Sequence, residues 1–306
     1  MFKFGVEQKT FTIGGVKVGG QPGQFPTVMM GTIFYHGDKL VEDERVGLFD
    51  RAAAEKVLDR EGEISLKTGN PRIVDVCASY PQAFEKFIDF VADATEGPFC
   101  IDGTTADVRI AGAKYVMETG LSSRVVYNSI SPEVREDELQ AIRDAGIKSA
   151  IILLLNTRNP LISGKFEVID GLLGKVSAAG VENILVDAAI FDILDPGPVS
   201  KAIYLVKERY GYPAGCGAHN AVDIWNKRRK LSPSIRFSST ITANILPVVM
   251  GADFMLYGPI ENAAKIYPVI ALADAYVAYT MWQEHGVRPS TNNHPFYNLH
   301  KIADIS

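Results

Sequence analysis

The sequence has few cysteines, and none of them is spaced as in a typical zinc or redox motif. Only three occur among 306 residues, Cys77, Cys100 and Cys216, and no two form a CxxC pair. They therefore predict no disulfide framework, and each lies in an apolar run where a buried thiol is expected. This usage is typical of a reducing compartment and favours a cytoplasmic protein.

A targeting signal and a membrane-spanning segment are also missing from the pattern. The first residues, MFKFGVEQKTF, contain no apolar core of a signal peptide. The most apolar late segment, residues 266–282, is interrupted by Pro268 and Asp274. This interruption favours a buried helix over a transmembrane one, so we expect no direct membrane insertion.

Positive charge is not in excess. Lys and Arg total 31 against 36 Asp and Glu, which gives a formal net charge of −5. The basic footprint of a nucleic-acid-binding protein is absent, and we expect no nucleic-acid partner. Hydrophobic residues make up 47% of the chain, which is enough for a large core.

The chain does contain a regular alternation of β-rich and helix-like runs. Residues 11–20, FTIGGVKVGG, alternate around Gly14 and Gly15, which predicts a hairpin. Eight strand candidates follow, and they begin at Thr27, Arg72, Phe99, Arg124, Ser149, Asn183, Ala214 and Asp253. Amphipathic runs separate these candidates, and several end at a glycine, as a helix C-cap does.

Eight β-then-α units without a mid-chain linker predict an α/β fold, a closed (β/α)8 TIM barrel. An N-terminal β-hairpin precedes it, and residues 1–306 form a single domain. The alternative is a doubly wound open sheet, which usually has fewer strands and a phosphate loop after the first. Here the first strand leads into TIFYHGDKLVEDE, which is neither GxGxxG nor GxxxxGK[ST].

Polar residues end several of the expected strands. In a TIM barrel, the C-terminal ends of the strands surround the active site. The third to seventh strands end in Asp102, Asn128, Asn156, Asp187 and Asn220. Carboxylates accept N–H bonds, while amides both donate and accept. This set suits a neutral heterocycle that is rich in N–H donors and ring acceptors.

Several other chemistries lack the residues that they require. The sequence contains no GxSxG nucleophile elbow and no His/Cys cluster with zinc spacing. No lysine ends a strand where it could form a Schiff base, and no basic ring is placed to hold a phosphate. We therefore expect neither a covalent nucleophile nor a protein-bound metal.

Each strand-end residue also has a purely structural alternative. Asp102 could cap the next helix, and Asn128 and Asn220 could serve in turns. Asn156 could simply begin a polar loop. Asp187 fits a structural role less well, because it lies in the apolar run ILVDAAI and a buried carboxylate is costly unless paired.

Two further residues are candidates. Asp75 lies within the strand IVDVCA, either as an inward polar group or as a salt-bridge partner. His219 precedes Asn220 and is either its neighbour in the chemistry or a packed core histidine.

Five segments together resemble the H subunit of tetrahydromethanopterin S-methyltransferase and its soluble bacterial relatives, which methylate tetrahydrofolate. These segments are GGQPGQFPTVMMGTIFY, LVEDERVGLFDRAAAE, FCIDGTTADVR, VVYNSIS and GAHNA. The resemblance covers nearly the whole chain and is most distinctive in the N-terminal third. The strand ends are also similar to those of other pterin-binding methyltransferase barrels, including the methyltetrahydrofolate:corrinoid/iron–sulfur protein methyltransferases.

This resemblance implies both a site and a reaction. The pterin would bind to Asp102, Asn128, Asp187 and Asn220, and a methyl group would move between the cobalt of a corrinoid (cobalamin) protein and N5 of the reduced pterin. Asn220 would reach N5. The corrinoid/iron–sulfur enzymes carry a serine before this asparagine, whereas His219 stands here, as it tends to in the H-subunit group.

The favoured function is methyl transfer from a methylated corrinoid protein to tetrahydrofolate, because the chain is compact enough to work alone. Tetrahydromethanopterin is the alternative acceptor, and a non-catalytic pterin-binding barrel is a second alternative. A dihydropteroate synthase is a third. It would need an asparagine ending the first strand and basic residues at the eighth, where FYH and YGP stand instead.

The late helical region, residues 271–286, is more apolar than a surface helix requires. It could pack against the barrel or form a contact between two copies of the chain. We expect a homodimer.

Overall fold

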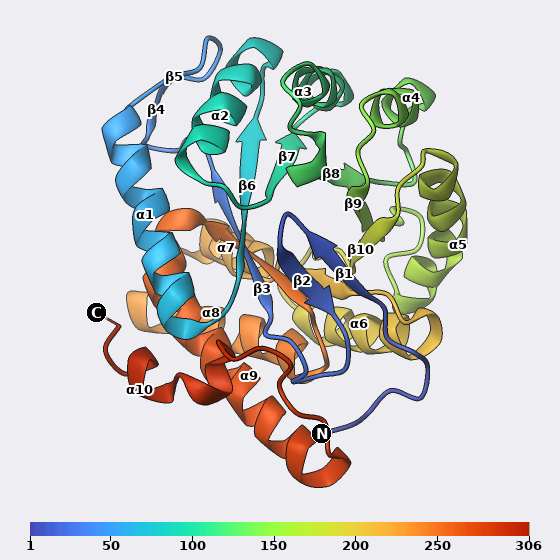
Figure 1. Ribbon diagram of the computed structural model, residues 1–306, viewed down its shortest axis with the longest axis vertical. Coiled ribbons are helices and arrows are strands. Elements are labelled where there is room, and N and C mark those ends of the chain that lie inside the picture. The colour runs from blue at the N-terminus through green and yellow to red at the C-terminus, as the bar shows by residue number, and fades with distance from the viewer. Residues whose placement is uncertain (306) are drawn as a thin grey trace.

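The computed structural model describes residues 1–305 and contains a closed barrel of eight parallel strands (Figure 1). The barrel strands are β3 (Val28–Ile33), β6 (Arg72–Ala78), β7 (Phe99–Gly103), β8 (Val125–Ile130), β9 (Ser149–Leu153), β10 (Asn183–Asp187), β11 (Ala214–Cys216) and β12 (Phe254–Pro259). They follow one another around the barrel in chain order, and β12 pairs with β3 to close it. The predicted (β/α)8 barrel is confirmed, and the open doubly wound sheet is excluded.

Helices surround the strands. They are α1 (Arg51–Thr68), α2 (Pro81–Ala94), α3 (Ala106–Glu118), α4 (Glu136–Asp144), α5 (Ile162–Ala178), α6 (Pro196–Tyr210), α7 (His219–Arg229), α8 (Pro233–Val249) and α9 (Ala263–His285). Two helices, α7 and α8, follow β11. The short segments are β4 (Val41–Asp43), β5 (Leu48–Phe49), η1 (Ser122–Arg124), η2 (Ile260–Asn262), η3 (Pro295–Tyr297) and α10 (Leu299–Ile302).

Local sequence signals set several helix ends. The Asp50 side chain accepts a hydrogen bond from the backbone N–H of Ala53 at 3.0 Å, which caps the start of α1. At the C-terminal ends of α1 and α6, Gly69 and Gly211 have φ values of 86° and 67°. This left-handed conformation ends a helix at least cost when the residue is glycine.

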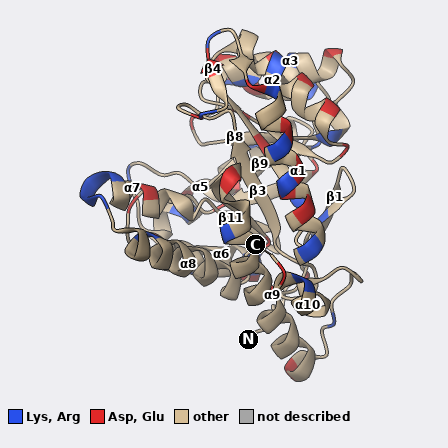
Figure 2. Cartoon of the chain, turned by 90° about the vertical axis from the view of Figure 1, so that its left-hand side faces the viewer, with Lys and Arg blue, Asp and Glu red and all other residues tan. Residues whose placement is uncertain are grey.

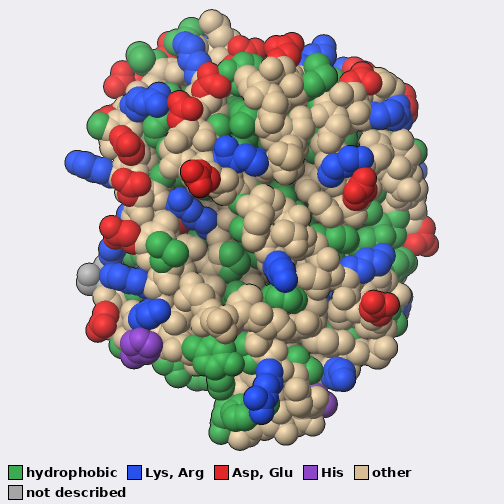
Figure 3. All heavy atoms as spheres, viewed as in Figure 1, with side chains coloured by type: hydrophobic (Ala, Val, Ile, Leu, Met, Phe, Trp, Pro, Cys, Tyr) green, Lys and Arg blue, Asp and Glu red, His purple; other side chains and the backbone are tan. Residues whose placement is uncertain are grey.

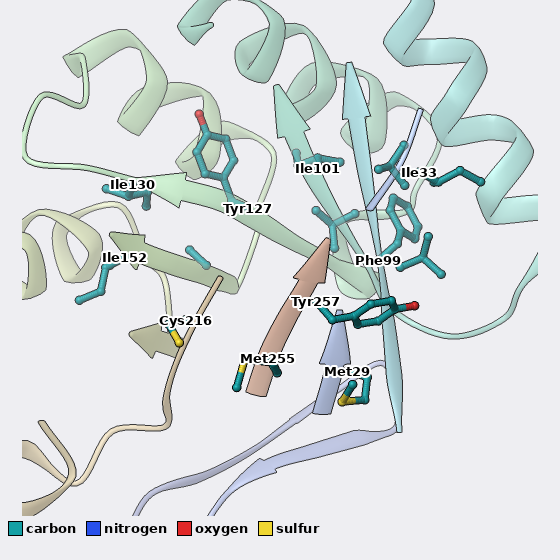
Figure 4. Close-up of a cluster of buried hydrophobic side chains, with 14 of the residues drawn as sticks. Met29, Ile33, Phe99, Ile101, Tyr127, Ile130, Ile152, Cys216, Met255 and Tyr257 are labelled. Atoms are coloured by element: carbon teal, nitrogen blue, oxygen red, sulfur yellow. The ribbon is translucent and has the colours of Figure 1, made fainter. Parts of the chain in front are cut away.

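Side chains alternate between two apolar layers along the strands. Those that point outward pack against the helices, and Figure 4 shows Met29, Phe99, Tyr127 and Met255 in this layer. The inward apolar set consists of Val28, Met30, Ile73, Cys100, Val126, Ile151, Leu185, Phe254 and Leu256. All three cysteines are buried and unpaired.

The N-terminal hairpin is present and packs against the inward layer. It consists of β1 (Thr10–Ile13) and β2 (Val16–Gly19), joined by Gly14 and Gly15, which both have positive φ. Ile13 and Val18 are buried among the inward residues, most of which lie at the beginnings of the barrel strands. The hairpin therefore fills the N-terminal end of the barrel (Figure 1). The polar strand termini lie at the opposite end.

The apolar late segment forms one continuous helix. α9 runs from Ala263 to His285 and contains both Pro268 and Asp274, which confirms the buried helix that the sequence predicts for this segment. Its buried face, which includes Ile266, Tyr267 and Ile270, packs on the barrel and holds the helix together. Among residues 1–305, no helix combines the length and the apolar character needed to cross a membrane.

Candidate functional site

A polar layer lies directly above the inward apolar layer of the barrel. Because strand side chains repeat with a period of two, the residue two positions after an inward residue also points inward. Asp102 follows Cys100 by two, Asn128 follows Val126, and Asp187 follows Leu185. Local strand geometry therefore directs these three polar side chains toward the barrel axis at the C-terminal end.

These side chains line a cavity of about 580 Å³. The cavity is lined by Thr32, Tyr35, His36, Asp75, Cys77, Asp102, Asn128, Ser129, Asp187, Gly217, His219, Asn220, Asp223, Lys227, Leu256, Gly258 and Pro259. The four residues expected to bind a pterin are thus brought together, and Asp75 and His219 join them. A flat heterocycle would fit a hollow of this size.

Asp75 is fully buried within the cavity wall and holds two neighbours in place. Its carboxylate accepts a hydrogen bond from the Thr32 hydroxyl at 2.8 Å and another from the Asn128 amide at 3.0 Å. The two alternatives left open by the sequence are thereby resolved, because Asp75 is an inward polar group without a salt bridge. Its contact fixes the Asn128 amide so that the amide oxygen is the group left for a ligand's N–H.

Asp102 lies opposite Cys77 and Asn128 in the strand register and is partly exposed to the cavity. Burial raises the pKa of its carboxyl well above the ordinary value, and the charge of Asp75 raises it further. The raised pKa favours the neutral, protonated form of the carboxyl group. It can then donate one hydrogen bond as well as accept others.

Asp187 is buried at the end of β10, and burial raises its pKa to about 6. Its Oδ1 atom accepts a hydrogen bond from the backbone N–H of Ala189 at 2.7 Å, which partly offsets the shift. The Lys165 ammonium contributes in the same direction, and its Nζ atom donates to the Ala189 carbonyl at 3.0 Å. The remaining carboxylate oxygen is free to accept from a ligand.

The turn after β11 places His219 and Asn220 at the start of α7. The His219 Nδ1 atom lies 3.1 Å from the carbonyl oxygen of Leu256, and a carbonyl can only accept, so Nδ1 carries the proton. Burial lowers the pKa of His219, which favours the neutral ring with an unprotonated Nε2. Gly258 has a φ of 83°, and a Cβ there would lie 2.8 Å from the ring. The ring therefore packs directly on the backbone of β12.

Asn220 is exposed at the rim of the cavity, and its side chain makes no hydrogen bond within the described residues. A Cβ on Gly217 would lie 3.0 Å from the Asn220 Nδ2 atom. Glycine at that position therefore leaves the amide room to turn, and an amide that turns can present either its oxygen or its nitrogen.

Asn156 is not brought into the cavity. Its amide group instead organises the loop between β9 and α5. The side-chain oxygen accepts from the backbone N–H groups of Arg158 and Asn159, each at 3.1 Å, and the nitrogen donates to the Gly164 carbonyl at 3.0 Å. This is the polar loop role that the sequence left as its alternative.

Sequence reasoning missed several residues of the site. Thr32 follows inward Met30 by two positions, so the same period could have identified it. Tyr35, Asp223 and Lys227 reach the cavity from a loop and a helix, where no strand period applies. Lys165 contacts the site from α5, and nothing in the local sequence of that helix marks it.

The polar lining of the cavity offers hydrogen-bonding groups. Among residues 1–305, no three His, Cys, Asp or Glu side chains are grouped so that they could hold a metal ion. The site instead offers four carboxyl groups, two amides, the neutral His219 ring and the Lys227 ammonium as hydrogen-bonding partners.

Solved structures with the same architecture bind pterins. A Yersinia pestis dihydropteroate synthase in complex with a pterin–sulfa conjugate has a TM-score of 0.63 and 11% identity, and covers 88% of this chain and 98% of its own. A Xanthomonas albilineans dihydropteroate synthase in complex with 7,8-dihydropteroate has a TM-score of 0.57 and 16% identity, with coverages of 92% and 99%. At these identities the likeness establishes the fold alone.

Sequence relatives are much more similar. The H subunit of tetrahydromethanopterin S-methyltransferase from Methanothermobacter thermautotrophicus is 37% identical over 98% of this chain and 100% of its own length. The corresponding protein from Methanocaldococcus jannaschii is 36% identical, with the same coverages. The model of the family described as the tetrahydromethanopterin S-methyltransferase MtrH subunit matches residues 6–290. Fold, family model and relatives agree with the resemblance read from the sequence, and the chain belongs to the MtrH family.

Proposed function

We propose that this chain transfers a methyl group between a corrinoid and N5 of a tetrahydropterin. The observation that carries the proposal is the inward layer of Asp102, Asn128 and Asp187, with Asn220 at its rim, in one barrel-end cavity. Family membership confirms the expected methyltransferase class. The relatives are named for tetrahydromethanopterin, so this pterin is now the favoured acceptor, ahead of the tetrahydrofolate that the sequence favoured.

The carboxyl and amide groups would hold the pterin head. Asp187 has a carboxylate oxygen free for the N–H groups of an amino-pyrimidinone edge, and Asn128 presents an amide fixed by Asp75. Asp102 can donate or accept, because its raised pKa brings the neutral acid within reach. Orientation of the pterin by these groups can lower the barrier by several kcal/mol, on the order of 7 in favourable cases.

In the forward direction, the lone pair of N5 attacks the methyl group of the methylated corrinoid in an SN2 displacement. The N–C bond forms, the Co–C bond breaks, and its electron pair stays on cobalt, which leaves as Co(I). The N5 cation then loses its proton. Asn220 can accept this N–H through its oxygen, or donate to N5 through its nitrogen when the reaction runs in reverse.

The methyl donor would arrive on a partner protein. The pterin lies in a cavity at the barrel mouth, and the corrinoid must reach N5 from outside because displacement requires contact at near van der Waals distance. We therefore propose a methylated corrinoid protein that docks over this mouth and presents cobalt at the rim near Asn220.

The first test is methyl transfer from free methylcobalamin to tetrahydromethanopterin and to tetrahydrofolate. We expect Asn220→Ala to lower kcat by about 100-fold, the order of a positioned acid–base group. Asn156→Ala is the matched control, because this amide lies outside the cavity. Wild-type turnover by Asn220→Ala would remove the residue from the mechanism. Pterin binding by the wild type without any transfer would instead favour the non-catalytic alternative.

We also propose a homodimer formed through α8 and α9. These helices flank a groove of about 310 Å³ that is lined only by apolar residues and includes Ile241, Ile245, Leu272 and Tyr276. α8 carries one charged residue, Arg236, and Figure 2 shows both helices almost free of charge. An uncharged face has no charges to neutralise and does not repel its own copy, so a second copy of the chain is the occupant that it suits best.

A further inference from the structure

A second cavity adjoins the barrel mouth. It has a volume of about 490 Å³ and lies between α7, the first half of α8 and the segment formed by η2 and the start of α9. It shares His219, Asp223 and Pro259 with the mouth cavity, so these three residues form the partition between the two hollows. We call it the side cavity. The shared lining places the two hollows side by side.

The two cavities differ in charge. The mouth cavity is lined by four aspartates, Asp75, Asp102, Asp187 and Asp223, against the single cation Lys227. The side cavity shares only Asp223 and adds two cations, Arg236 and Lys265. An anionic group is therefore favoured in the side cavity and disfavoured at the mouth.

Several polar groups of the side cavity have few or no partners within the protein. Within residues 1–305, Lys265 makes no ion pair, and the Asn262 side chain makes no hydrogen bond. Arg236 reaches only Asp223, at a long 3.5 Å. The Phe237 ring is 51% exposed. The unpaired Lys265 and Asn262, the weakly paired Arg236 and the exposed Phe237 ring lie within one hollow and suit an aryl group joined to an anion.

We propose that the side cavity binds the side chain of the tetrahydropterin. This inference rests on the proposed function. Tetrahydrofolate and tetrahydromethanopterin share a pterin head, and both carry an aryl-containing side chain that ends in anionic groups. The aryl group packs on Phe237, and the anionic end binds Arg236 and Lys265.

The experiment is a calorimetric titration with three ligands. They are tetrahydromethanopterin, tetrahydrofolate and 6-methyltetrahydropterin, which has the head without the long side chain. The double variant Arg236→Ala/Lys265→Met is expected to bind the two long ligands roughly tenfold or more weakly, because two charge-assisted contacts are lost. Its affinity for 6-methyltetrahydropterin should match the wild type. In the wild type, added salt should weaken binding of the long ligands only.

Arg228→Ala is the matched control. Arg228 is an exposed cation of α7 that lies outside both cavities and pairs with Asp192 at 3.1 Å. Its loss should leave all three affinities unchanged. The substituted residues Arg236 and Lys265 are exposed, so the fold should survive, and equal thermal midpoints would verify this.

The possible results distinguish failure of the side-cavity proposal from failure of the proposed function. If the double variant binds the long ligands as tightly as the wild type does, the side cavity is not their subsite, while the function stands. The same holds if the variant weakens all three ligands equally. If the wild type binds none of the three, the proposed function fails as well. Phe237→Ala provides a second test. It should lower the affinity for the two long ligands without changing how that affinity depends on salt.

Discussion

The carboxyl group of Asp187 lies in surroundings that penalise its charge. Burial raises its pKa from 3.8 to about 6, although the Ala189 N–H and the Lys165 ammonium oppose the shift. Because the folded-state pKa exceeds the unfolded one, ionisation costs the folded protein stability. The cost is absent below about pH 4, grows between pH 4 and 6, and is complete above pH 6. Asp187 therefore lowers the stability of the folded protein while its carboxylate faces the cavity.

Asp187→Asn should consequently stabilise the ligand-free protein at pH 7.5. The amide oxygen can still accept from the Ala189 N–H, and the charge penalty is removed. We expect a gain of about 1–2 kcal/mol, less than the roughly 3 kcal/mol that a shift of two pKa units represents. Chemical denaturation at pH 7.5 and pH 4 measures it.

The gain should disappear at pH 4, and pterin affinity at pH 7.5 should fall in the same variant. Asp187→Ala, which also loses the bond to Ala189, serves as the comparison. It should weaken pterin binding without the gain in stability. A less stable Asp187→Asn protein at pH 7.5 would show that the charge is required for folding and does not cost the folded protein stability.

At the scale of single elements, strand periodicity explains most of the site. Asp102, Asn128 and Asp187 were identified from sequence because each ends a strand, and the inward direction then follows from its neighbours. The same period also directs Thr32 inward, because it follows Met30 by two positions. Asn156 was a candidate for the same reason, yet it lies three residues beyond β9. Past the end of a strand the period no longer applies, and loop hydrogen bonds fix this side chain.

Helix α9 depends on one buried carboxylate near its middle. Asp274 accepts hydrogen bonds from the Thr27 N–H at 2.9 Å, the Thr27 hydroxyl at 2.7 Å and the Asn70 amide at 2.6 Å. These bonds join α9 to the segments just before β3 and β6. The residue that looked like an interruption in an apolar run is therefore an attachment point between the helix and the barrel.

Asp274→Leu should lower the free energy of unfolding by about 3–5 kcal/mol. The substitution leaves three buried donors without an acceptor, and each unsatisfied group costs about 1–3 kcal/mol. Urea denaturation measures the loss. Asp274→Asn retains one acceptor oxygen and should lose less. If both variants unfold at the wild-type midpoint, these hydrogen bonds contribute no net stability.

At the scale of the whole molecule, charge is distributed unevenly. On the face seen in Figure 3, basic and acidic side chains are interspersed, and no continuous basic stripe crosses it. The last turn of α7 carries three basic residues, whereas the neighbouring helix α8 carries only one charged residue, Arg236 (Figure 2). Part of residues 271–286 packs on the barrel, as one interpretation of the sequence expected, while Leu272 and Tyr276 stay 37% and 64% exposed.

The proposed homodimer predicts a change of mass on substitution of this face. Tyr276→Glu together with Leu272→Glu should convert a dimer into a monomer, because burying unpaired carboxylates at an apolar contact is costly. Sedimentation equilibrium at micromolar concentration measures the mass. Lys148→Glu changes an exposed residue far from α8 and α9 in the barrel order and is the control. A monomeric wild type would exclude the dimer.

The sequence by itself determined the strands, the barrel and the polar strand ends. Hydrophobic periodicity and glycine positions are local properties, and a strand's period of two directs its side chains whatever lies around it. Tertiary structure decided which polar groups meet. It brought Asp75 onto Asn128 and Lys165 onto the turn after Asp187, and it formed the side cavity from α7, α8 and α9. These contacts join residues far apart in the chain, and only closure of the barrel and packing of the helices bring them within hydrogen-bonding distance.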